Sequence, residues 1–280
     1  MRETMRRSAM ATVAMLALVA AGGAARGQEP ATVVGPDELL AAHNAWAGSI
    51  EHVWSRAALM LNFPTGRKDG RRERHDLDGH FFLDKPDRLF IHGQMLGQDV
   101  FTVGQNPERF WLWIRPGVNT VWVGRRGGKG EKDFILSPSD LMRACGMVPI
   151  ELAADAAAEV VAGRTHYVLT EQRRVGPDRM PWRRTWFDRR TLRPVRVDLF
   201  DEVGRRLVMA ELLKYERVGQ TDVCTVYRAR FYGDEEVALV LRLSKVSLDK
   251  QPNPRVFEYR LPPGAKERDL DAPAPSTPES

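Results

Sequence analysis

Residues 79–124 place the strongest constraint on how this chain can fold. Short runs rich in Phe, Trp, Val and Ile are separated there by Gly, Pro, Asn and Asp, at intervals of about ten residues. Such spacing is typical of an antiparallel β-meander, in which short strands are joined by tight turns. The run at 110–114 is apolar at nearly every position, whereas a sheet with one wet face alternates. We therefore expect a sheet covered on both sides, its inner side by its own core or by a ligand.

The rest of the chain extends this pattern into one mainly β domain with a few helices, an α+β arrangement. A helix is predicted at 36–47, where Pro and two acidic residues open an apolar stripe, and a second at 137–146, with a Ser cap before Pro. The Ala-rich piece at 150–157 is expected to add a helical turn or two. Strands are predicted at 50–62, 72–84, 87–95, 98–104, 108–115, 119–124, 158–162, 164–174, 180–188, 193–200, 205–217, 222–233, 236–248 and 255–259.

The N-terminus has the composition of a secretory signal peptide over residues 1–27. Three arginines precede an apolar run at 10–21, and Ala25 and Gly27 suit the positions before a cleavage site. The run is too short and too rich in Gly and Ala for a membrane span. No cysteine stands near the end of this run, where a lipoprotein would carry its lipid. We therefore expect a periplasmic protein that is exported across the inner membrane and not lipid-anchored. The folded domain is predicted at 28–265, and a disordered tail at 266–280.

Charge and cysteine content exclude little but set useful bounds. The net charge is +5, and residues 1–27 hold four Arg and one Glu, which leaves about +2 for the exported chain. This near-balance gives no support for a nucleic-acid partner. The two cysteines, Cys145 and Cys224, could pair in an oxidising compartment, and the sequence leaves open whether they do.

Catalytic and metal-binding motifs are not recognisable. His75 and His80 would point to opposite faces of a strand, and the acidic residues between them do not complete a calcium loop. The Gly-rich segment at 124–130 lacks the spacing of a phosphate-binding loop, and there is no nucleophile elbow. We therefore expect no enzyme, no cofactor and no metal. The aromatic residues of 81–122 have two interpretations: an ordinary packed core, or the wall of a lipophilic cavity inside a curved sheet.

Four motifs, in their order, resemble the LolA/LolB superfamily of bacterial envelope proteins, which also includes RseB-like sensors. The first is a helix with an aromatic end at 39–46 that leads into a long strand. The second, at 79–86, is similar to the family's G-x-φ-φ-x-x-[RK]-P strand and turn. The others are the apolar strands at 89–91 and 110–114, and a C-terminal pattern that ends in Pro-Pro-Gly at 262–264.

The resemblance implies an incomplete antiparallel β-barrel of roughly eleven strands, with helices that form a lid over the concave face. Leu89 and Ile91 match positions that face the cavity in the family's carriers. Lys85 stands where LolA-type carriers have an arginine that helps to hold the lid, and an ammonium cannot make the same forked contacts. The expected ligand-binding residues are Leu89, Ile91, Phe101, Trp111, Trp113, Val121 and Val123, and the expected lid residues are Leu40, Trp46, Leu141 and Lys85.

The implied function is that of a periplasmic carrier that binds lipoprotein acyl chains or lipids in a hydrophobic cavity and performs no chemistry. Its expected partners are the acyl chain or lipid and an inner- or outer-membrane protein, with no nucleic acid. Two alternatives stay open at this point. One is an RseB-like sensor of acyl chains in envelope signalling, and the other is a structural envelope module with a filled core and no ligand.

Overall fold

The computed structural model describes residues 34–64, 72–115, 119–132, 134, 137–154, 156–233 and 236–272. The predicted signal peptide lies outside these residues, as does 273–280 of the predicted tail. None of the helices in the described ranges is long and apolar enough to cross a membrane.

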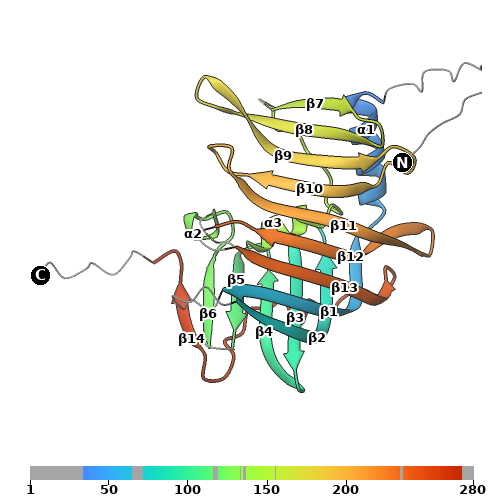
Figure 1. Cartoon of the computed structure of the whole chain (residues 1–280). Helices are drawn as coiled ribbons and strands as arrows, with labels where there is room; N and C mark the ends of the chain where they lie inside the picture. The colour runs from blue at the N-terminus through green and yellow to red at the C-terminus, as the bar shows by residue number, and fades with distance from the viewer. Residues whose placement is uncertain are drawn as a thin grey trace, which may run out of the picture. The chain divides into compact units, whose positions relative to one another are not determined.

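In the described part of the chain, fourteen strands form one sheet (Figure 1). The N-terminal half contains β1 (His52–Pro64), β2 (Arg72–Asp84), β3 (Arg88–Met95), β4 (Gln98–Gln105), β5 (Arg109–Ile114) and β6 (Thr120–Arg125). The C-terminal half contains β7 (Ala157–Ala162), β8 (His166–Val175), β9 (Asp178–Asp188), β10 (Pro194–Phe200), β11 (Arg206–Val218), β12 (Thr221–Phe231) and β13 (Val237–Ser247), and β14 (Lys266–Asp269) follows.

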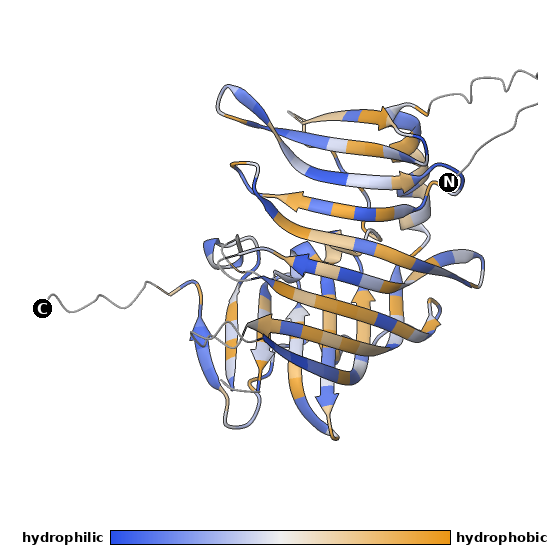
Figure 2. Ribbon diagram, in the orientation of Figure 1, coloured by the Kyte–Doolittle hydropathy of each residue, from blue (hydrophilic) through white to orange (hydrophobic). Residues whose placement is uncertain are grey.

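Each half is an antiparallel meander, and the pairing of β1 with β13 joins the two. Strands β3–β6 run at a steep angle to the strands of the C-terminal half, while β1 and β2 follow β13, so the sheet bends (Figure 1). The strand order ends at β14 and β7, and within the described residues these two edges do not meet. The fold is therefore an incomplete β-barrel, as expected. Hydrophobic and hydrophilic residues alternate along many of the strands (Figure 2), because successive side chains point to opposite faces.

Helix α1 (Pro36–Gly48) begins with Pro and two acidic residues, and it buries Leu39, His43, Trp46 and Ala47. These positions form one stripe at helical spacing, and the predicted helix is confirmed to within one residue. Helix α3 (Pro138–Ala144) begins at the predicted cap, where the Ser137 hydroxyl accepts a 3.4 Å hydrogen bond from the amide of Asp140. Helix α3 contacts β4 of one half and β10 and β11 of the other. It therefore lies inside the bend of the sheet.

Several local predictions were wrong. The segment predicted as a strand at 255–259 contains a 3₁₀ turn, η1 (Pro254–Phe257), because Asn253 caps it by accepting from the amide of Arg255 at 3.0 Å. The described residues of 150–157 contain no helix, since so short a helix needs tertiary packing to form. A one-turn helix, α2 (Lys129–Lys132), replaces part of the predicted Gly-rich loop.

The domain extends past the predicted boundary at 265. Strand β14 begins at Lys266 and pairs in parallel with β6, so the predicted tail does not start there. All four residues of β14 are exposed, so the sequence carries no apolar pattern that would mark a strand. Backbone pairing alone defines it. With β14, the sheet has fourteen strands where the family resemblance implied about eleven.

In the part of the chain that the structure describes, buried apolar residues form three clusters. The main core fills the bend between the two halves and includes α3. A second cluster packs α1 against β8 and β9 through Leu39, Tyr167, Leu169 and Phe187. A third, the outer cluster, consists of Trp111, Trp113, Val121 and Val123 with Phe90, Tyr259 and Ala265 packed against it. The sheet is thus covered on both sides in its N-terminal half.

Candidate functional site

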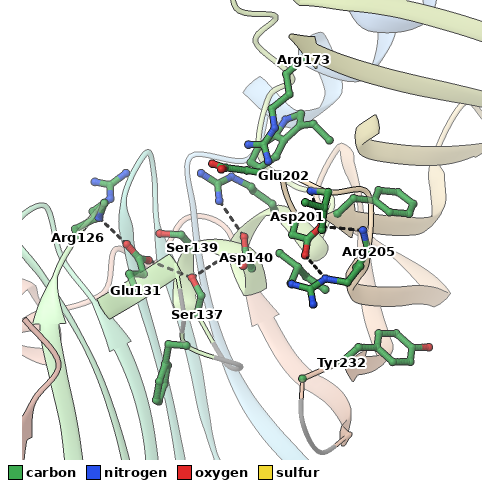
Figure 3. Close-up of a pocket in the computed structure, with 18 of the residues that line it drawn as sticks. Arg126, Glu131, Ser137, Ser139, Asp140, Arg173, Asp201, Glu202, Arg205 and Tyr232 are labelled. Carbon is green, nitrogen blue, oxygen red and sulfur yellow. Dashed lines mark hydrogen bonds and ion pairs between the residues drawn. The ribbon is translucent and has the colours of Figure 1, made fainter. Parts of the chain in front are cut away.

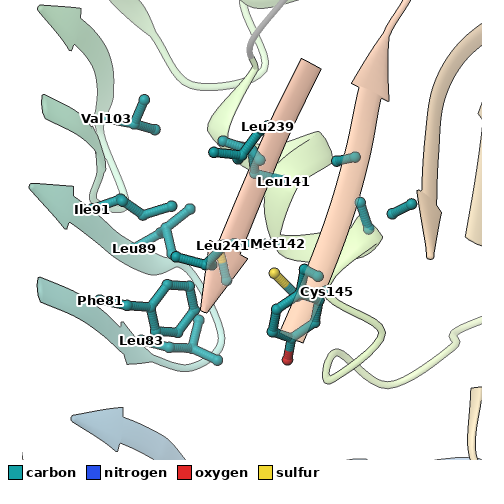
Figure 4. Close-up of a cluster of buried hydrophobic side chains, with 14 of the residues drawn as sticks. Phe81, Leu83, Leu89, Ile91, Val103, Leu141, Met142, Cys145, Leu239 and Leu241 are labelled. Carbon is teal, nitrogen blue, oxygen red and sulfur yellow. The ribbon is translucent and has the colours of Figure 1, made fainter. Parts of the chain in front are cut away.

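The concave side of β2, β3 and β4 is an apolar wall. Phe81 and Leu83 of β2, Leu89 and Ile91 of β3, and Val103 of β4 alternate with outward residues, as strand geometry requires. Each of these five side chains is at most 1% exposed. Figure 4 shows them facing Leu239 and Leu241 of β13 across a cluster that includes residues of α3. We call these five residues of β2–β4 the inner wall.

Helix α3 fills the space in front of the inner wall. Leu141 and Met142 project from it into the cluster and are each 4% exposed (Figure 4). Burial of a side chain of this size stabilises a fold by about 1.5–3 kcal/mol. The helix has only seven residues, too few to be stable without tertiary packing. In the described conformation the inner wall is therefore closed by a small element that depends on its packing.

Polar contacts hold α3 from both ends. The hydroxyl of Ser139 donates to the side-chain oxygen of Gln105 on β4 at 2.8 Å. After the helix, the chain passes beside α1, where the ring Nε2 of His43 donates to the carbonyl of Val148 at 3.2 Å. Asn44 makes two hydrogen bonds with the backbone of Ile150, at 2.7 and 3.0 Å. The segment that follows α3 is thus joined to α1 by several hydrogen bonds, while its apolar side chains pack in the cores against the sheet.

Lys85 links the end of β2 to α1 and to the segment after α3. It follows β2, and its ammonium donates to the carbonyl of Ala47 at the end of α1 and to the carbonyl of Met147 after α3, the latter at 3.0 Å. Burial lowers the pKa of Lys85 to about 8, and Glu51 opposes this effect only in part. One cation therefore bridges both helical segments through single hydrogen bonds, without the fork that an arginine would offer.

His43 is a buried histidine on α1 with a strongly shifted pKa. Its side chain is 1% exposed, and burial lowers its pKa to about 4, although the hydrogen bond to Val148 acts in the opposite direction. The positive charges of Arg183, Lys85 and Arg193 lower it further. The ring is therefore neutral at pH 7, and it packs against Trp46 and Phe187 at centroid distances of 5.6 and 5.4 Å.

An open cleft of about 1060 Å³ borders α3 on the side away from the inner wall (Figure 3). Apolar and charged groups both line it. They are Pro107, Arg126, Gly127, Glu131, Phe134, Ser137, Ser139, Asp140, Arg143, Arg173, Trp182, Phe200, Asp201, Glu202, Val203, Arg205, Leu207, Tyr232 and Gly233. A second cleft, of about 820 Å³, shares three of these residues and extends toward Lys85 and Glu51.

Most charges in the large cleft are paired. Arg143 bonds Asp140 at 3.0 Å, and Arg205 bonds Asp201 at 2.7 Å. Burial nevertheless raises the pKa of Asp140 above its ordinary value, against the effect of Arg143. Glu131 accepts hydrogen bonds from the amide of Gly127 at 2.7 Å and from the hydroxyl of Ser137 at 3.2 Å (Figure 3).

The seven residues expected to bind ligand do not share one wall. Leu89, Ile91 and Phe101 belong to the main core on the concave side. Trp111, Trp113, Val121 and Val123 belong to the outer cluster, on the opposite face. Strand β5 turns Leu112 inward, so its two tryptophans must point out. Gly104 of β4 could have indicated where Trp111 lies, because the two residues are paired. A Cβ at position 104 would stand 2.1 Å from the indole of Trp111, so only glycine leaves room for the tryptophan.

The four expected lid residues fall on three elements. Leu141 lies on α3 and packs in the main core with the inner wall, and its role in a lid stays a prediction. Leu40 and Trp46 lie on α1, where Leu40 packs on the second cluster and Trp46 donates its indole N–H to the carbonyl of Asp222 at 2.9 Å. Lys85 contacts both helical segments. Sequence reasoning missed Met142 as a wall contact, and it missed the aromatic and basic residues of the cleft.

The two cysteines are both free and buried. Cys145 caps the C-terminus of α3, and Cys224 lies on β12. Burial raises the thiol pKa of Cys145 to about 12 and that of Cys224 to about 11. Both are therefore thiols at neutral pH, and neither has the character of a nucleophile.

The fold of this chain is similar to that of two solved structures, one of which is a LolA superfamily protein. A LolA superfamily protein from Nitrosomonas europaea aligns with a TM-score of 0.51 and 9% identity, over 81% of this chain and 99% of its own. A DUF1329 family protein from Desulfovibrio piger aligns with a TM-score of 0.50 and 16% identity, over 79% of this chain and 95% of its own. At these identities the likeness concerns the fold. No family model and no curated protein matches the sequence.

Proposed function

We propose that this protein is a carrier that binds an acyl chain against the inner wall after α3 moves away. The observation that carries the proposal is the combination of a deeply apolar concave wall with a cover of seven residues beside an open cleft. Leu89, Ile91 and Phe101 are the proposed ligand contacts. Trp111, Trp113, Val121 and Val123 are not part of this wall, because they face the other side of the sheet.

The energies of the two occupants favour such an exchange. Withdrawing Leu141 and Met142 forfeits roughly 3–6 kcal/mol of apolar burial. An acyl chain of about a dozen methylenes gains on the order of 10 kcal/mol at about 0.8 kcal/mol per buried CH₂, before the entropic cost of binding. A long chain can therefore displace the helix, whereas a short one cannot. Binding of this kind serves a carrier or a sensor of acyl chains, and neither needs a catalytic group.

The fold supports this function, and the predicted signal peptide supports a periplasmic location. Export across the inner membrane would bring the protein to the periplasm, where lipoprotein acyl chains need a water-soluble escort. Lys85 would act as a latch, since its two hydrogen bonds join the end of α1 to the segment after α3. Opening the latch removes one link between that segment and α1. The hydrogen bonds from His43 and Asn44 must open as well, and no strand pair has to break.

The direct test is lipid recovery. Mature protein purified from the envelope fraction is extracted with organic solvent, and the extract is analysed by mass spectrometry. In parallel, the purified protein is titrated with a dansyl-labelled undecanoic acid, whose emission rises in an apolar site. The proposal predicts co-purified acyl lipid and saturable binding of the probe. The absence of both would reject the carrier.

The filled interior supports a second candidate, a structural module without ligand. The inner wall is at most 1% exposed, and α3 packs on it as a core element would. For such a module, displacement of α3 would be part of global unfolding. Hydrogen exchange separates the two functions: a carrier opens α3 at a lower free energy than β2 and β3, while a structural module opens all three together.

A further inference from the structure

A β-bulge in β9 turns Trp182 toward the cleft. Glu171 pairs with Arg183 and Gln172 pairs with Pro181, so Trp182 is the extra residue between them. Both Arg183 and Glu171 are buried and ion-paired, on the face of β8 and β9 that packs against α1. A bulge of this kind places two successive side chains on one face and is frequent beside functional sites. Trp182 accordingly lines both clefts.

Two arginines pack on this indole. The guanidinium carbons of Arg143 on α3 and Arg173 on β8 each lie 5.1 Å from the ring centroid of Trp182. A guanidinium that rests on an aromatic ring keeps its N–H edge free to donate. The stack therefore fixes the position of two cations and leaves their donors available to a group in the cleft.

Arg173 is the less satisfied of the two. Arg143 is paired with Asp140 at 3.0 Å. For Arg173, no ion pair is found among the described residues, and its Nε is buried without a hydrogen-bond partner there. Leaving a buried charged donor unpaired is costly. In Figure 3 Arg173 reaches into the cleft from above, and this geometry points to a missing acceptor.

The other charges around the cleft do not supply that acceptor. Asp201 is engaged by Arg205 at 2.7 Å, and Glu131 is engaged by Gly127 and Ser137. Arg126 is paired with Asp87 at 2.9 Å. Glu202 lines the cleft and is exposed, so it can remain in water when an anion enters. An incoming oxyanion would therefore meet Arg173 without displacing an ion pair among the described residues.

We propose that Arg173, with Arg143 and Trp182, binds the oxyanion of the ligand's head, a carboxylate or a phosphate. This inference rests on the proposed acyl carrier: α3 separates the cleft from the inner wall, so a chain that displaces α3 has its head at the stack. The planar fork of Arg173 suits two oxygens of one such group. The ligand class is thus an anionic acyl lipid rather than a neutral one.

The test compares two probes of equal chain length, dansyl-labelled undecanoic acid and its methyl ester, on wild type, Arg173→Gln and Arg173→Lys. Arg174→Gln is the matched control, because Arg174 is exposed and lines neither cleft. Wild type should bind the acid about tenfold or more tighter than the ester, the usual effect of a hydrogen bond to a charged group. Arg173→Gln should lose this preference with unchanged affinity for the ester, Arg173→Lys should keep part of it, and Arg174→Gln should keep all of it.

The outcomes separate the head site from the carrier. Equal binding of acid and ester by wild type would overturn the oxyanion site and leave the carrier standing. Binding of neither probe would reject the carrier, and with it this inference. Titration with inorganic phosphate forms a third arm: competition with the acid but not with the ester supports the shared oxyanion chemistry. An acid preference that survives in Arg173→Gln would place the anion elsewhere.

Discussion

Shortening Leu141 to Ala is predicted to strengthen the binding of an acyl chain, although it weakens the fold. Leu141 is 4% exposed and packs in front of the inner wall. A buried Leu→Ala change typically removes about 2–5 kcal/mol of stability. In the proposed mechanism this loss falls on the closed form alone, because α3 is already displaced when a ligand is bound.

The size of the effect follows from the population of the open form. Only the open form binds, so the apparent Kd equals the Kd of the open form divided by the fraction of molecules that are open. If opening becomes easier by about 2 kcal/mol, the apparent Kd falls roughly 30-fold, at about 1.4 kcal/mol per factor of ten. The gain stops once the open form predominates, so the predicted range is about 10-fold to 30-fold.

The assay is a fluorescence titration with dansyl-labelled undecanoic acid, combined with urea unfolding of each variant. Leu169→Ala is the matched control. Leu169 is fully buried, but it lies in the second cluster under α1, away from α3. Its truncation should cost similar stability and leave affinity unchanged. Equal or weaker binding by Leu141→Ala, at a confirmed loss of stability, would refute the view that α3 occupies the ligand's place.

Three further predictions concern titratable groups. The pKa of His43 is about 4 in the folded protein, below the ordinary 6.5, so on acidification the unfolded chain takes up the proton first. The free energy of unfolding should therefore fall by about 3 kcal/mol between pH 6.5 and 4. Unfolding measured across this pH range checks the prediction, and the decrease should be absent in His43→Gln. Because the pKa of Lys85 is lowered to about 8 from 10.5, the unfolded chain holds the proton in that window, so the stability of wild type relative to Lys85→Met should rise from pH 8 to 10.5. Cys145 and Cys224, both buried thiols, should resist iodoacetamide in the native protein, and saturating acyl ligand should expose Cys145 alone; equal labelling of both would mean that more than α3 moves.

Much of the fold could be predicted from the sequence because strand and turn signals are local. Gly, Pro and Asn at regular intervals marked the hairpins of both meanders. The stripe of Leu39, His43 and Trp46 marked α1. The misses at β14 and η1 differ in cause, since β14 depends on its pairing with the distant β6, whereas η1 is capped locally by Asn253. Neither carries an apolar period that the sequence could reveal.

The candidate site was harder to predict, because strand parity decides which face a side chain occupies. Leu89 and Ile91 lie in the main core on the concave side, and their role as ligand contacts stays a prediction. On β5 every position from Phe110 to Ile114 is apolar, so the pattern could not tell Leu112 from the flanking tryptophans, and a shift of one residue reverses every side chain. The position of Trp182 in the cleft could not be predicted from the sequence either, because a bulge sets the direction of its side chain. That bulge appears only in the pairing of β8 with β9.

The buried position of Ile91 also changes how the wall can be tested. An Ile91→Glu substitution suits an open pocket, where a carboxylate would repel the ligand and spare the fold. In the closed form, Ile91 is 1% exposed beneath α3, and an unpaired carboxylate there would cost several kcal/mol of folding stability. Loss of binding in that variant could therefore result from unfolding as well as from a changed binding surface on the inner wall. Substitutions on α3 avoid this ambiguity, because they act on the occupant that the ligand must replace.

A gate made of packing rather than of ion pairs fits the role of a carrier. Helix α3 ends at Ala144, and the turn after it contains Gly146, whose φ of +68° and close contacts with Pro194 and Leu212 suit no larger residue. Its hold on the wall comes mainly from Leu141 and Met142, and a ligand supplies the same kind of contact. Affinity should then depend on chain length, since each methylene adds about 0.8 kcal/mol while the cost of displacing α3 stays fixed. Chains too short to outweigh that cost would be left in solution, so the helix itself sets the shortest cargo that the protein accepts.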